Sequence, residues 1–393
     1  MKKLLFVLDS LSIGGAEKSL VSLLNSIDYS RFEIDLLLFK RGGDLEELLP
    51  KEINYVPTPD YFRYLNKEYF SFKENLKFLG CRLKTSIDLR KNTLSKVVLH
   101  SEQIVYKNIK KIISTIDNTY DVAIGYSQGM PTYFVANHVK AMRKLAWINT
   151  DYVNTLYNKE IDYQSYKKID KIITVSKNTQ QTVANLKKDY QDKTDILLDI
   201  VNPDIINRLA EENQPLEYLN NNINILTVGR LETAKSYDTA IEVAKLLRDS
   251  GYKFKWFCIG EGSERQRLEG LISQYNLNNN FILLGKKLNP YSYMKCCTLY
   301  VQTSKKEGFG LTVCEAKILK KPIVCTNFPT AKEIIDHDID GLIVHNSVDD
   351  IFQGIKRYLD DVEYLKRITN QLNERETYSS INQLEKFYTL LEL

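Results

Sequence analysis

The 393-residue sequence lacks the features that mark secreted, metal-binding or membrane-spanning proteins. Its six cysteines form no CxxC pair, which is typical of reduced, buried thiols in a reducing compartment. None of its four histidines stands at ligand spacing from another, so no metal is expected. No window approaches the ~18 uninterrupted apolar residues of a spanning helix, and the apolar run from Leu4 to Leu8 is too short for a signal peptide. Any membrane contact is therefore expected to be peripheral.

Two nucleotide-binding motifs are absent as well. There is no GxGxxG after a strand and no GxxxxGK[ST], which argues against a nicotinamide enzyme and a P-loop ATPase. The formal net charge of +4 is too small to suggest a nucleic-acid partner. Hydrophobic residues make up 43% and charged residues 26%, as in an ordinary globular protein. The length predicts two domains, because one hydrophobic core rarely serves so long a chain.

Positive charge is concentrated in one region, residues 62–112. This region holds twelve Lys or Arg against four acidic residues. Aromatic residues are interleaved with the charges: Phe62, Tyr64, Tyr69, Phe70, Phe72 and Phe78. A basic, aromatic surface is typical of contact with anionic lipid head groups. The alternative is a solvated helical face combined with ordinary core aromatics.

The first half of the chain has the pattern of a doubly wound α/β domain. A buried strand at 4–8 leads through a glycine turn to a helix at 16–27 and a second strand at 33–39. Further short apolar runs at 122–124, 145–148 and 172–175 alternate with helical segments. One parallel sheet with helices on both faces is therefore expected through about residue 200.

The pattern restarts after a polar segment at 211–222. Strands are predicted at 223–228, 255–259, 281–284, 299–302, 322–325 and 342–344, with a helix at 237–250. The expected fold class is α/β, with two Rossmann-like domains facing each other across a cleft, where ligands collect. We expect an acceptor-side domain at 1–205, a donor domain at 206–372, and a helical segment at 373–393 that crosses back to the first domain.

Two glutamates around a glycine turn form the sharpest local signal. The segment reads Glu307, Gly308, Phe309, Gly310, Leu311, Thr312, Val313, Cys314, Glu315. On one helix the glutamates would be ~80° out of register, so Glu307 is placed in the loop and Glu315 in a helix that begins near Gly310. The free amides of a helix N-terminus suit a diphosphate, and the small glycines let it approach the backbone. Glu315 can accept both ribose hydroxyls, while Glu307 faces a sugar; the alternative is a glycine turn that only caps a helix.

A second signal follows the restarted strand directly. Arg230 and Lys235 stand in the loop at the carboxyl end of that strand, where α/β sheets bind ligands. Their charges can neutralise two phosphates without a metal. Basic surface residues are also common after strands, so this motif alone decides little.

Taken together, these segments resemble the retaining family-4 glycosyltransferases of the two-domain fold known as GT-B, over nearly the whole chain. The matching positions are Gly14 to Glu17, Ile172 to Ser176, Asn202 and Pro203, Gly229 and Arg230 with Lys235, Gly260 to Gly262, Leu284 and Gly285 with Tyr291, and Glu307 to Glu315. The C-terminal matches are specific in order and spacing, and the N-terminal ones are looser.

The resemblance implies a role for each of these positions. Arg230 and Lys235 would grip the donor diphosphate, Glu315 the ribose and Glu307 the donor sugar. The backbone of Gly310 to Thr312 would meet the distal phosphate, and Gly14 and Gly15 would lie beside the reacting phosphate. Gly308 and Phe309 are also expected among the donor-binding positions. No cofactor or metal is implied, because the nucleotide sugar is itself a substrate.

Two departures from the family pattern concern the site. The chain has Asn149 where family members often carry a histidine, and asparagine can hydrogen-bond a sugar hydroxyl but cannot titrate near neutrality. Ser236 stands where glycine often follows the lysine. A third segment, Asp336, His337 and Asp338, matches a short manganese-binding pattern, but its place in a predicted turn favours a surface role.

The sequence thus predicts an enzyme that transfers a hexose with retention from a nucleoside-diphosphate sugar, with UDP as the favoured nucleotide. The predicted acceptor is a hydroxyl of a growing glycan, for which a lipid-linked form at the inner membrane face is favoured. The expected location is therefore cytoplasmic, with peripheral membrane contact. One alternative is a catalytically silent binding or chaperone subunit of the same shape, which Asn149 keeps open. Another is an epimerase acting on the nucleotide sugar.

Overall fold

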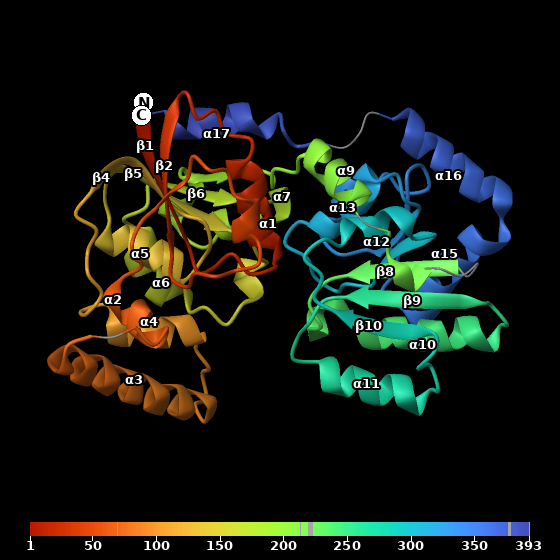
Figure 1. Cartoon of the computed structure of the whole chain (residues 1–393), viewed down its shortest axis with the longest axis horizontal. Coiled ribbons are helices and arrows are strands. Elements are labelled where there is room, and N and C mark those ends of the chain that lie inside the picture. The colour runs from red at the N-terminus through yellow and green to blue at the C-terminus, as the bar shows by residue number, and fades with distance from the viewer. Residues whose placement is uncertain (69, 213, 219–222, 376–378, 393) are drawn as a thin grey trace. The chain divides into compact units, whose positions relative to one another are not determined.

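The computed structural model describes residues 1–68, 70–212, 214–218, 223–375 and 379–392. The chain forms two compact units, of which the first comprises residues 1–198 and 383–393 and the second residues 199–382. Tyr69 and part of the polar segment at 211–222, namely residues 213 and 219–222, lie outside the described residues. Figure 1 colours and labels the elements of both units.

The first unit is built on a seven-stranded parallel sheet of order β3-β2-β1-β4-β5-β6-β7. Its strands are β1 (Lys2–Leu8), β2 (Phe32–Leu38), β3 (Asn54–Tyr55), β4 (Thr119–Gly125), β5 (Lys140–Ile148), β6 (Lys171–Thr174) and β7 (Thr194–Ile196). Its helices are α1 (Gly15–Leu24), α2 (Asp60–Leu65), α3 (Phe72–Thr93), α4 (Ser101–Ile109), α5 (Met130–His138), α6 (Lys159–Tyr166), α7 (Lys177–Ala184), α8 (Lys188–Gln191) and the terminal α17 (Gln383–Leu391). Short 3-10 turns lie at Glu46–Leu48 and Tyr152–Asn154.

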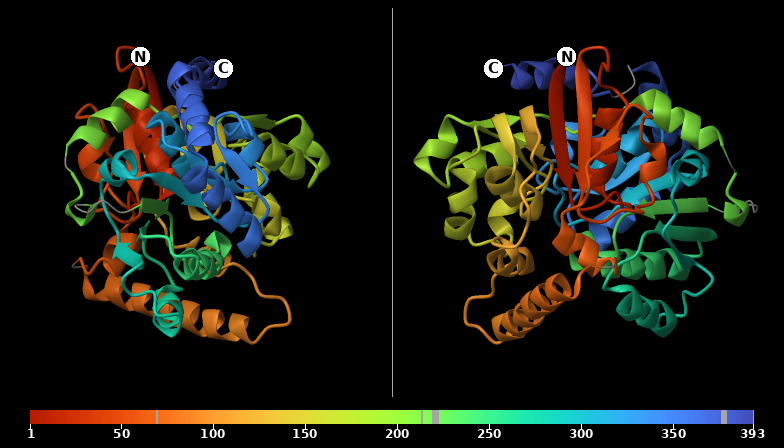
Figure 2. Two further views of the ribbon diagram at one scale, coloured as in Figure 1. Left: turned by 90° about the vertical axis from the view of Figure 1, so that its right-hand side faces the viewer. Right: turned by 60° about the vertical axis from the view of Figure 1, so that its left-hand side comes forward.

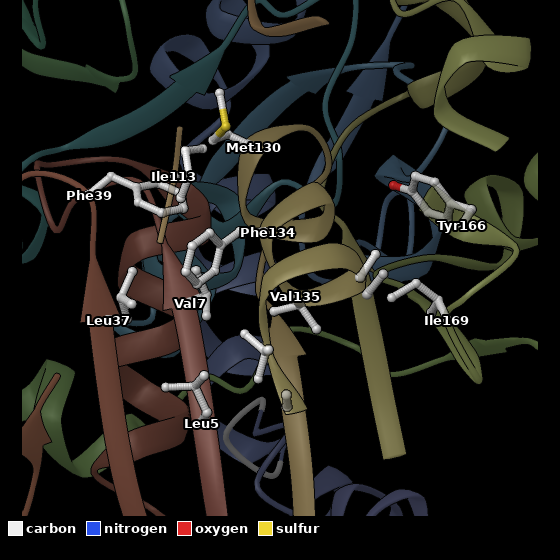
Figure 3. Packing of buried hydrophobic residues seen from close by; sticks show 14 of the residues in the cluster. Leu5, Val7, Leu37, Phe39, Ile113, Met130, Phe134, Val135, Tyr166 and Ile169 are labelled. Atoms are coloured by element: carbon white, nitrogen blue, oxygen red, sulfur yellow. The ribbon is translucent and has the colours of Figure 1, made fainter. Parts of the chain in front are cut away.

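The core of this unit lies between the sheet and the helices on one of its faces. Leu5, Val7 and Leu37 point from the strands toward Phe134 and Val135 of α5 (Figure 3). Continuous apolar strands of this kind are typical of a parallel sheet that helices cover on both sides. The predicted doubly wound sheet is therefore confirmed, and only its short edge strands β3 and β7 were not anticipated.

The second unit repeats the plan with a six-stranded parallel sheet of order β10-β9-β8-β11-β12-β13. Its strands are β8 (Ile223–Val228), β9 (Phe254–Ile259), β10 (Phe281–Gly285), β11 (Leu299–Gln302), β12 (Ile323–Thr326) and β13 (Leu342–Val344). Its helices are α9 (Pro203–Glu211), α10 (Tyr237–Asp249), α11 (Arg265–Gln274), α12 (Tyr291–Cys296), α13 (Leu311–Ile318), α14 (Ala331–Ile334), α15 (Val348–Asp360) and α16 (Val362–Glu374). Short 3-10 turns lie at Leu216–Tyr218 and Thr233–Lys235.

The chain passes from the first unit to the second before α9. This helix packs on α12 and α13, and its residues Ile206, Leu209 and Ala210 share a small core with Tyr291 and Ile318. The polar segment that follows also belongs to the second unit, since Tyr218 lies 4.8 Å from the ring of Phe257. The passage therefore lies at residues 198 and 199, ahead of the expected boundary at 205.

The segment at 373–393 is helical only in part. The helix α16 ends at Glu374, residues 376–378 lie outside the described residues, and α17 begins at Gln383. Between them Ser380 accepts a hydrogen bond from the backbone N–H of Val201 at 2.7 Å. A serine that bonds to backbone groups competes with helix formation, so the prediction of a helix through the whole stretch is wrong.

The helix α17 packs on the strands of the first unit. Phe387 is fully buried, with its ring centroid 6.3 Å from that of Phe6 and 6.4 Å from that of Trp147. Tyr388 stacks on Phe32 at 5.4 Å and its hydroxyl accepts the N–H of Asp28. The last helix thus completes the core of the first unit. In Figures 1 and 2 its blue ribbon lies beside the red start of the chain. Among the described residues, no helix combines the length and apolarity that crossing a bilayer requires.

We expect the substitution Phe387→Ala to lower the unfolding free energy of the first unit by about 3–5 kcal/mol, because it leaves a cavity among three aromatic rings. Urea unfolding followed by tryptophan fluorescence measures this change. In a Trp256→Phe background the signal comes from Trp147 alone, which lies in the first unit. The exposed neighbour Thr389→Ala serves as the control and is expected to unfold like the background. Equal midpoints for both variants would show that α17 is not part of this core.

Candidate functional site

Strand order places the loops that carry the predicted donor residues. In the second sheet β8 lies between β9 and β11, so chain connections from β8 and β11 leave in opposite directions. Ligands of doubly wound sheets bind at the carboxyl ends of strands at such a reversal. The loop after β8 contains Arg230 and Lys235, and the loop after β11 contains Glu307. The predicted donor residues Arg230, Lys235 and Glu307 therefore lie on the two loops next to this reversal of strand order.

Lys235 and Glu307 form the central contact of the site. The Lys235 ammonium lies 2.6 Å from both carboxylate oxygens of Glu307, and the two side chains are 17% and 10% exposed. Ser304 donates a further hydrogen bond to Glu307 at 2.6 Å, and the amide of Gln302 another at 3.2 Å. Glu307 is thus held by four donor contacts and keeps a fixed orientation.

The network extends to the start of α13. The Tyr300 hydroxyl donates to the Gln302 side-chain oxygen at 2.7 Å, and Thr312 approaches the same oxygen at 3.4 Å. Gly310 begins the helix with φ of 104°, and an added Cβ there would lie 2.9 Å from Ile334. A glycine is required for this left-handed start, so the helix end that carries Leu311 and Thr312 is set by local backbone geometry.

The loop after β8 is held close to the loop after β9. Gly260 has φ of 150°, and a Cβ there would lie 1.9 Å from the carbonyl oxygen of Gly229. The Lys235 side chain then passes Gly229 at van der Waals distance, within 3.6 Å of where a Cβ would stand. This close approach directs the lysine toward Glu307.

Arg230 differs from Lys235 in its surroundings. Its side chain is 65% exposed and pairs with Glu232 at 2.8 Å. It therefore lies in the predicted loop, but the structure does not bring it into the Glu307 network. Of the other predicted donor positions, Gly308 is half-buried and Phe309 is buried, with its carbonyl accepting the Thr330 hydroxyl at 2.7 Å.

Glu315 is buried and accepts the Tyr291 hydroxyl at 2.9 Å. Burial, with the neighbouring Glu315 carboxylate, raises the pKa of Tyr291 well above its usual value. Tyr291 therefore stays a hydrogen-bond donor and fixes one oxygen of Glu315. Tyr291 was noted in the sequence only as a matching position, and its contact with Glu315 across 24 positions could not be read there.

The first unit carries Gly14, Gly15 and Asn149 around the corresponding reversal, between β1 and β4. Asn149 follows β5 and donates its amide to the Tyr126 carbonyl at 2.7 Å. The Tyr126 hydroxyl in turn lies 3.0 Å from Ser19 of α1, the helix that Gly14 and Gly15 begin. The Asn149 side-chain oxygen is buried and has no hydrogen-bond partner among the described residues. The Asn149 side chain therefore has an oxygen that can accept a hydrogen bond, and one of its two N–H donors is already used.

Asp9 at the same edge was missed by the sequence reasoning. It follows β1 directly, and that placement at the carboxyl end of a central strand was the available signal. Desolvation by surrounding protein and the carboxylates of Glu102 and Glu17 raise the pKa of Asp9 to about 8, although the residue keeps exposed surface. A hydrogen bond from Ser127 opposes the shift. Asp9 is therefore harder to ionise than an ordinary aspartate.

The residues set aside as a metal site are engaged in ion pairs. Arg375 contacts Asp336, and Asp338 lies 3.2 Å from Arg357. Within the described ranges, no group of three or more His, Cys, Asp or Glu side chains is placed to hold a metal ion. A cavity of about 690 Å³ lies elsewhere in the first unit, between α3, α4, α5 and α6, and none of the predicted site residues lines it.

Ser236 generates a stability prediction. Its φ of 49° lies in the left-handed region, and its buried hydroxyl has no hydrogen-bond partner in the described part of the chain. A residue with a side chain loses about 1–2 kcal/mol of stability when its backbone adopts this left-handed conformation. We expect Ser236→Gly to raise the unfolding free energy of the second unit by about 1 kcal/mol after the flexibility that glycine adds to the unfolded chain.

The measurement is urea unfolding with Trp256 as reporter in a Trp147→Phe background. Ser236→Ala is the matched control, because it removes the hydroxyl but keeps the left-handed cost. Glycine is expected to be the more stable of the two, and the reverse order would exclude backbone strain as the cause.

Asp9 generates a pH prediction for the first unit. Its folded pKa of about 8 exceeds the unfolded value of about 3.9. The folded state therefore binds the proton more tightly, and this contribution to stability is lost as pH rises from about 4 through about 8. We expect Asp9→Asn to raise the melting temperature above pH 8 and to leave it unchanged below pH 4. Differential scanning fluorimetry across this range checks it, and a pH-independent difference would rule out the raised pKa.

Comparison with known proteins places these findings in a family. Residues 210–375 match the family model described as glycosyl transferases group 1. A Campylobacter jejuni enzyme, N-acetylgalactosamine-N,N'-diacetylbacillosaminyl-diphospho-undecaprenol 4-alpha-N-acetylgalactosaminyltransferase, is 27% identical over 378 residues, which cover 95% of each chain. The poly(ribitol-phosphate) alpha-N-acetylglucosaminyltransferase of Staphylococcus aureus is 26% identical over 307 residues, covering 76% of this chain and 59% of that protein.

Solved structures show the same fold over the full length. Anabaena HepE in complex with UDP and glucose superposes with a TM-score of 0.71 at 16% identity, covering 100% of this chain and 99% of that one. A mutant of TarM from S. aureus, solved with fondaparinux, alpha-GlcNAc-glycerol and UDP, gives a TM-score of 0.66 at 18% identity and covers 100% of both chains.

The matched family model spans the Lys235–Glu307 network and α13, and the relatives and solved structures extend the likeness through the first unit. Residues 210–375 therefore match the group 1 glycosyltransferases, and the whole chain has the two-domain GT-B fold. Together with the full-length relative, these matches identify the chain as a glycosyltransferase that takes its sugar from a nucleotide sugar.

Proposed function

We propose that this enzyme transfers a hexose, with retention of the anomeric configuration, from a UDP-sugar to a hydroxyl of a lipid-linked glycan in cell-surface polysaccharide synthesis. The observation that carries the donor part is the convergence of Lys235, Glu307 and the start of α13 at one sheet edge. Such a site offers a cation, free helix amides and a carboxylate within one network. These are the groups that a diphosphate joined to a sugar requires.

In this proposal the ion pair rearranges when the donor binds. The diphosphate takes a share of the Lys235 charge, and the N–H groups at the start of α13 meet the distal phosphate. Ser304 and Gln302 keep the Glu307 carboxylate in place, so that it can accept hydrogen bonds from the sugar hydroxyls once Lys235 has shifted toward the diphosphate. As the bond between the sugar and the leaving diphosphate breaks, negative charge grows on the phosphate, and Lys235 stabilises it.

Other predicted residues complete the donor and acceptor sites. Glu315, with one oxygen fixed by Tyr291, accepts the ribose hydroxyls. Arg230 can reach the diphosphate if its ion pair with Glu232 breaks. Breaking this pair costs little free energy because the pair is exposed to solvent. Gly14 and Gly15 let the reacting phosphate approach the backbone, and the unpartnered oxygen of Asn149 accepts a sugar hydroxyl. The leaving phosphate accepts the acceptor's proton, so no metal or cofactor is required.

The acceptor proposal draws on the relatives. The C. jejuni enzyme is named for a diphospho-undecaprenol acceptor, and both relatives are named as N-acetylhexosaminyltransferases. UDP-N-acetylhexosamines are therefore the first donors to test here. A lipid-linked acceptor places the enzyme at the inner face of the membrane, with residues 62–112 as the contacting region.

A silent binding subunit is disfavoured by the intact donor network. The Lys235–Glu307 pair is largely buried, and a buried ion pair adds little to folding compared with apolar residues of the same size. A subunit without turnover would gain nothing from it. An epimerase would in turn leave the basic region at 62–112 without a purpose.

We expect Lys235→Met to lower kcat/KM about 10²–10³-fold, the usual cost of losing one group that stabilises transition-state charge. Release of UDP from UDP-N-acetylhexosamines measures the rate. Because removing one partner of a buried pair also destabilises the fold, the double variant Lys235→Met with Glu307→Gln is included. It is expected to recover the melting temperature but not the activity.

Lys245→Ala on the exposed face of α10 is the control and is expected to turn over donor normally. Full activity in the Lys235→Met protein would contradict the proposed donor site. Absence of turnover in the unmodified protein, with UDP still bound, would favour the silent subunit.

A further inference from the structure

The helix α3 presents an apolar face to solvent. Phe72, Leu76, Leu79, Leu83 and Ile87 recur every three or four residues, so they lie on one face of this helix. Their exposed fractions are 84%, 62%, 43%, 57% and 52%. Contiguous exposed apolar residues of this extent mark a contact surface, since single ones are scattered on ordinary surfaces. We name these five residues the outer stripe.

The opposite face of α3 is the one that packs on the first unit, and it is partly polar. Phe78 and Thr85 are the buried residues of this helix. Cys81 donates to the carbonyl of Asn108 at 3.3 Å, and the Asn108 amide donates to Asp88 at 2.9 Å. Folding of the unit therefore uses the more polar side of α3 and leaves the more apolar side outside, the reverse of a surface helix of a soluble domain.

The aromatic residues that suggested a membrane surface in the sequence lie elsewhere. Phe62 and Phe78 are buried, and Tyr64 and Phe70 pack against the same core. Only Phe72 of that set is largely exposed among the described residues. The surface is thus made mainly of leucines and an isoleucine, and the aromatic part of the sequence interpretation is wrong.

Basic residues flank the outer stripe. The helix contains Lys73, Lys77, Arg82, Lys84, Arg90 and Lys91 against Glu74 and Asp88. At 100° per residue, Lys73, Lys77, Lys84 and Lys91 lie along one side of the stripe and Arg82 along the other. Among the described residues, none of these six side chains forms an ion pair. Their charges are therefore available to a partner.

The chain beyond α3 continues the same character. Leu94, Val97 and Val98 are 88%, 66% and 41% exposed. Figures 1 and 2 show α3 as a separate rod at the margin of the first unit. The cavity between α3, α4, α5 and α6 lies behind its last turns, where Asp88, Lys91 and Asn92 line it. The outer stripe is thus accessible along the whole helix.

From these contacts we propose that α3 and the turn to residue 98 form an in-plane membrane anchor. The outer stripe enters the boundary between head groups and acyl chains, while the flanking lysines and arginines reach the phosphates of anionic lipids. Charge selects this partner over a second copy of the chain, because two such faces would bring like charges together. The inference gives the proposed lipid-linked acceptor its membrane contact and rests on that proposal for its purpose only.

Vesicle flotation tests the anchor with the full chain. The protein is mixed with vesicles of pure phosphatidylcholine or with vesicles that also contain phosphatidylglycerol, whose negative surface attracts basic segments. We expect binding to the anionic vesicles, a loss of at least about tenfold in Leu76→Glu with Leu83→Glu, and weaker, lipid-independent binding in Lys77→Glu with Lys84→Glu. Val362→Glu on α16, another exposed apolar position, is the matched control and is expected to bind normally.

A UDP thermal shift separates this inference from the proposed function. An equal shift in the unmodified protein and in the Leu76→Glu, Leu83→Glu variant shows an intact donor site. Absence of any shift would contradict the proposed function, while flotation would still judge the anchor. No binding of the unmodified protein to anionic vesicles would overturn the anchor. So would a dimer in analytical ultracentrifugation that the stripe variant dissociates, because the stripe would then be a contact between copies.

Discussion

The ion pair between Lys235 and Glu307 depends on a constraint that the whole second unit shares, the reversal of strand order between β8 and β11. Connections from these neighbouring strands leave in opposite directions, so their first loop residues meet at one edge with no helix between them. The absence of a side chain at Gly260 lets the loop after β8 approach closely. The left-handed backbone of Gly310 lets the loop after β11 lead directly into α13. Without this arrangement the two loops would lie apart, and the contact between Lys235 and Glu307 would not form.

The first unit repeats the same constraint with a different chemical content. Its reversal between β1 and β4 brings together Asp9, the glycines that begin α1, and the Tyr126 carbonyl that holds Asn149. No lysine or arginine follows these two strands directly. One unit therefore has a partly buried lysine at its reversal, and the other has a carboxyl group together with backbone and amide hydrogen-bonding groups. This difference supports the division between donor and acceptor roles that the resemblance implied.

Much of this fold could be predicted from the sequence, because buried parallel strands appear as short apolar runs. The strand at 223–228 and the strands at 299–302 and 342–344 match the structure in both bounds. The short edge strands β3 and β7 escaped notice, since two or three residues with polar neighbours give no periodicity. The sequence indicated Lys235 and Glu307 as candidate site positions, but it did not predict that they contact each other. The pairing of Lys235 with Glu307 spans 72 positions, and the exposure of Arg230 depends on Glu232 beside it.

The outer stripe of α3 shows where sequence periodicity stops being informative. Apolar residues at helical spacing indicate a helix with one apolar face, but they do not say which face packs on the protein. Here Cys81, Thr85, Asp88 and the Asn108 contact hold the polar face inward, so the stripe faces out. The donor site obeys the ordinary rule, with charges at strand ends and apolar residues inside. The second unit follows this rule, but α3 of the first unit inverts it. Exposure of so many apolar side chains to water is unfavourable, so the outer stripe is expected to have a partner. The inversion is therefore consistent with the proposed lipid-linked acceptor, which would lie at the membrane surface that the outer stripe is proposed to enter.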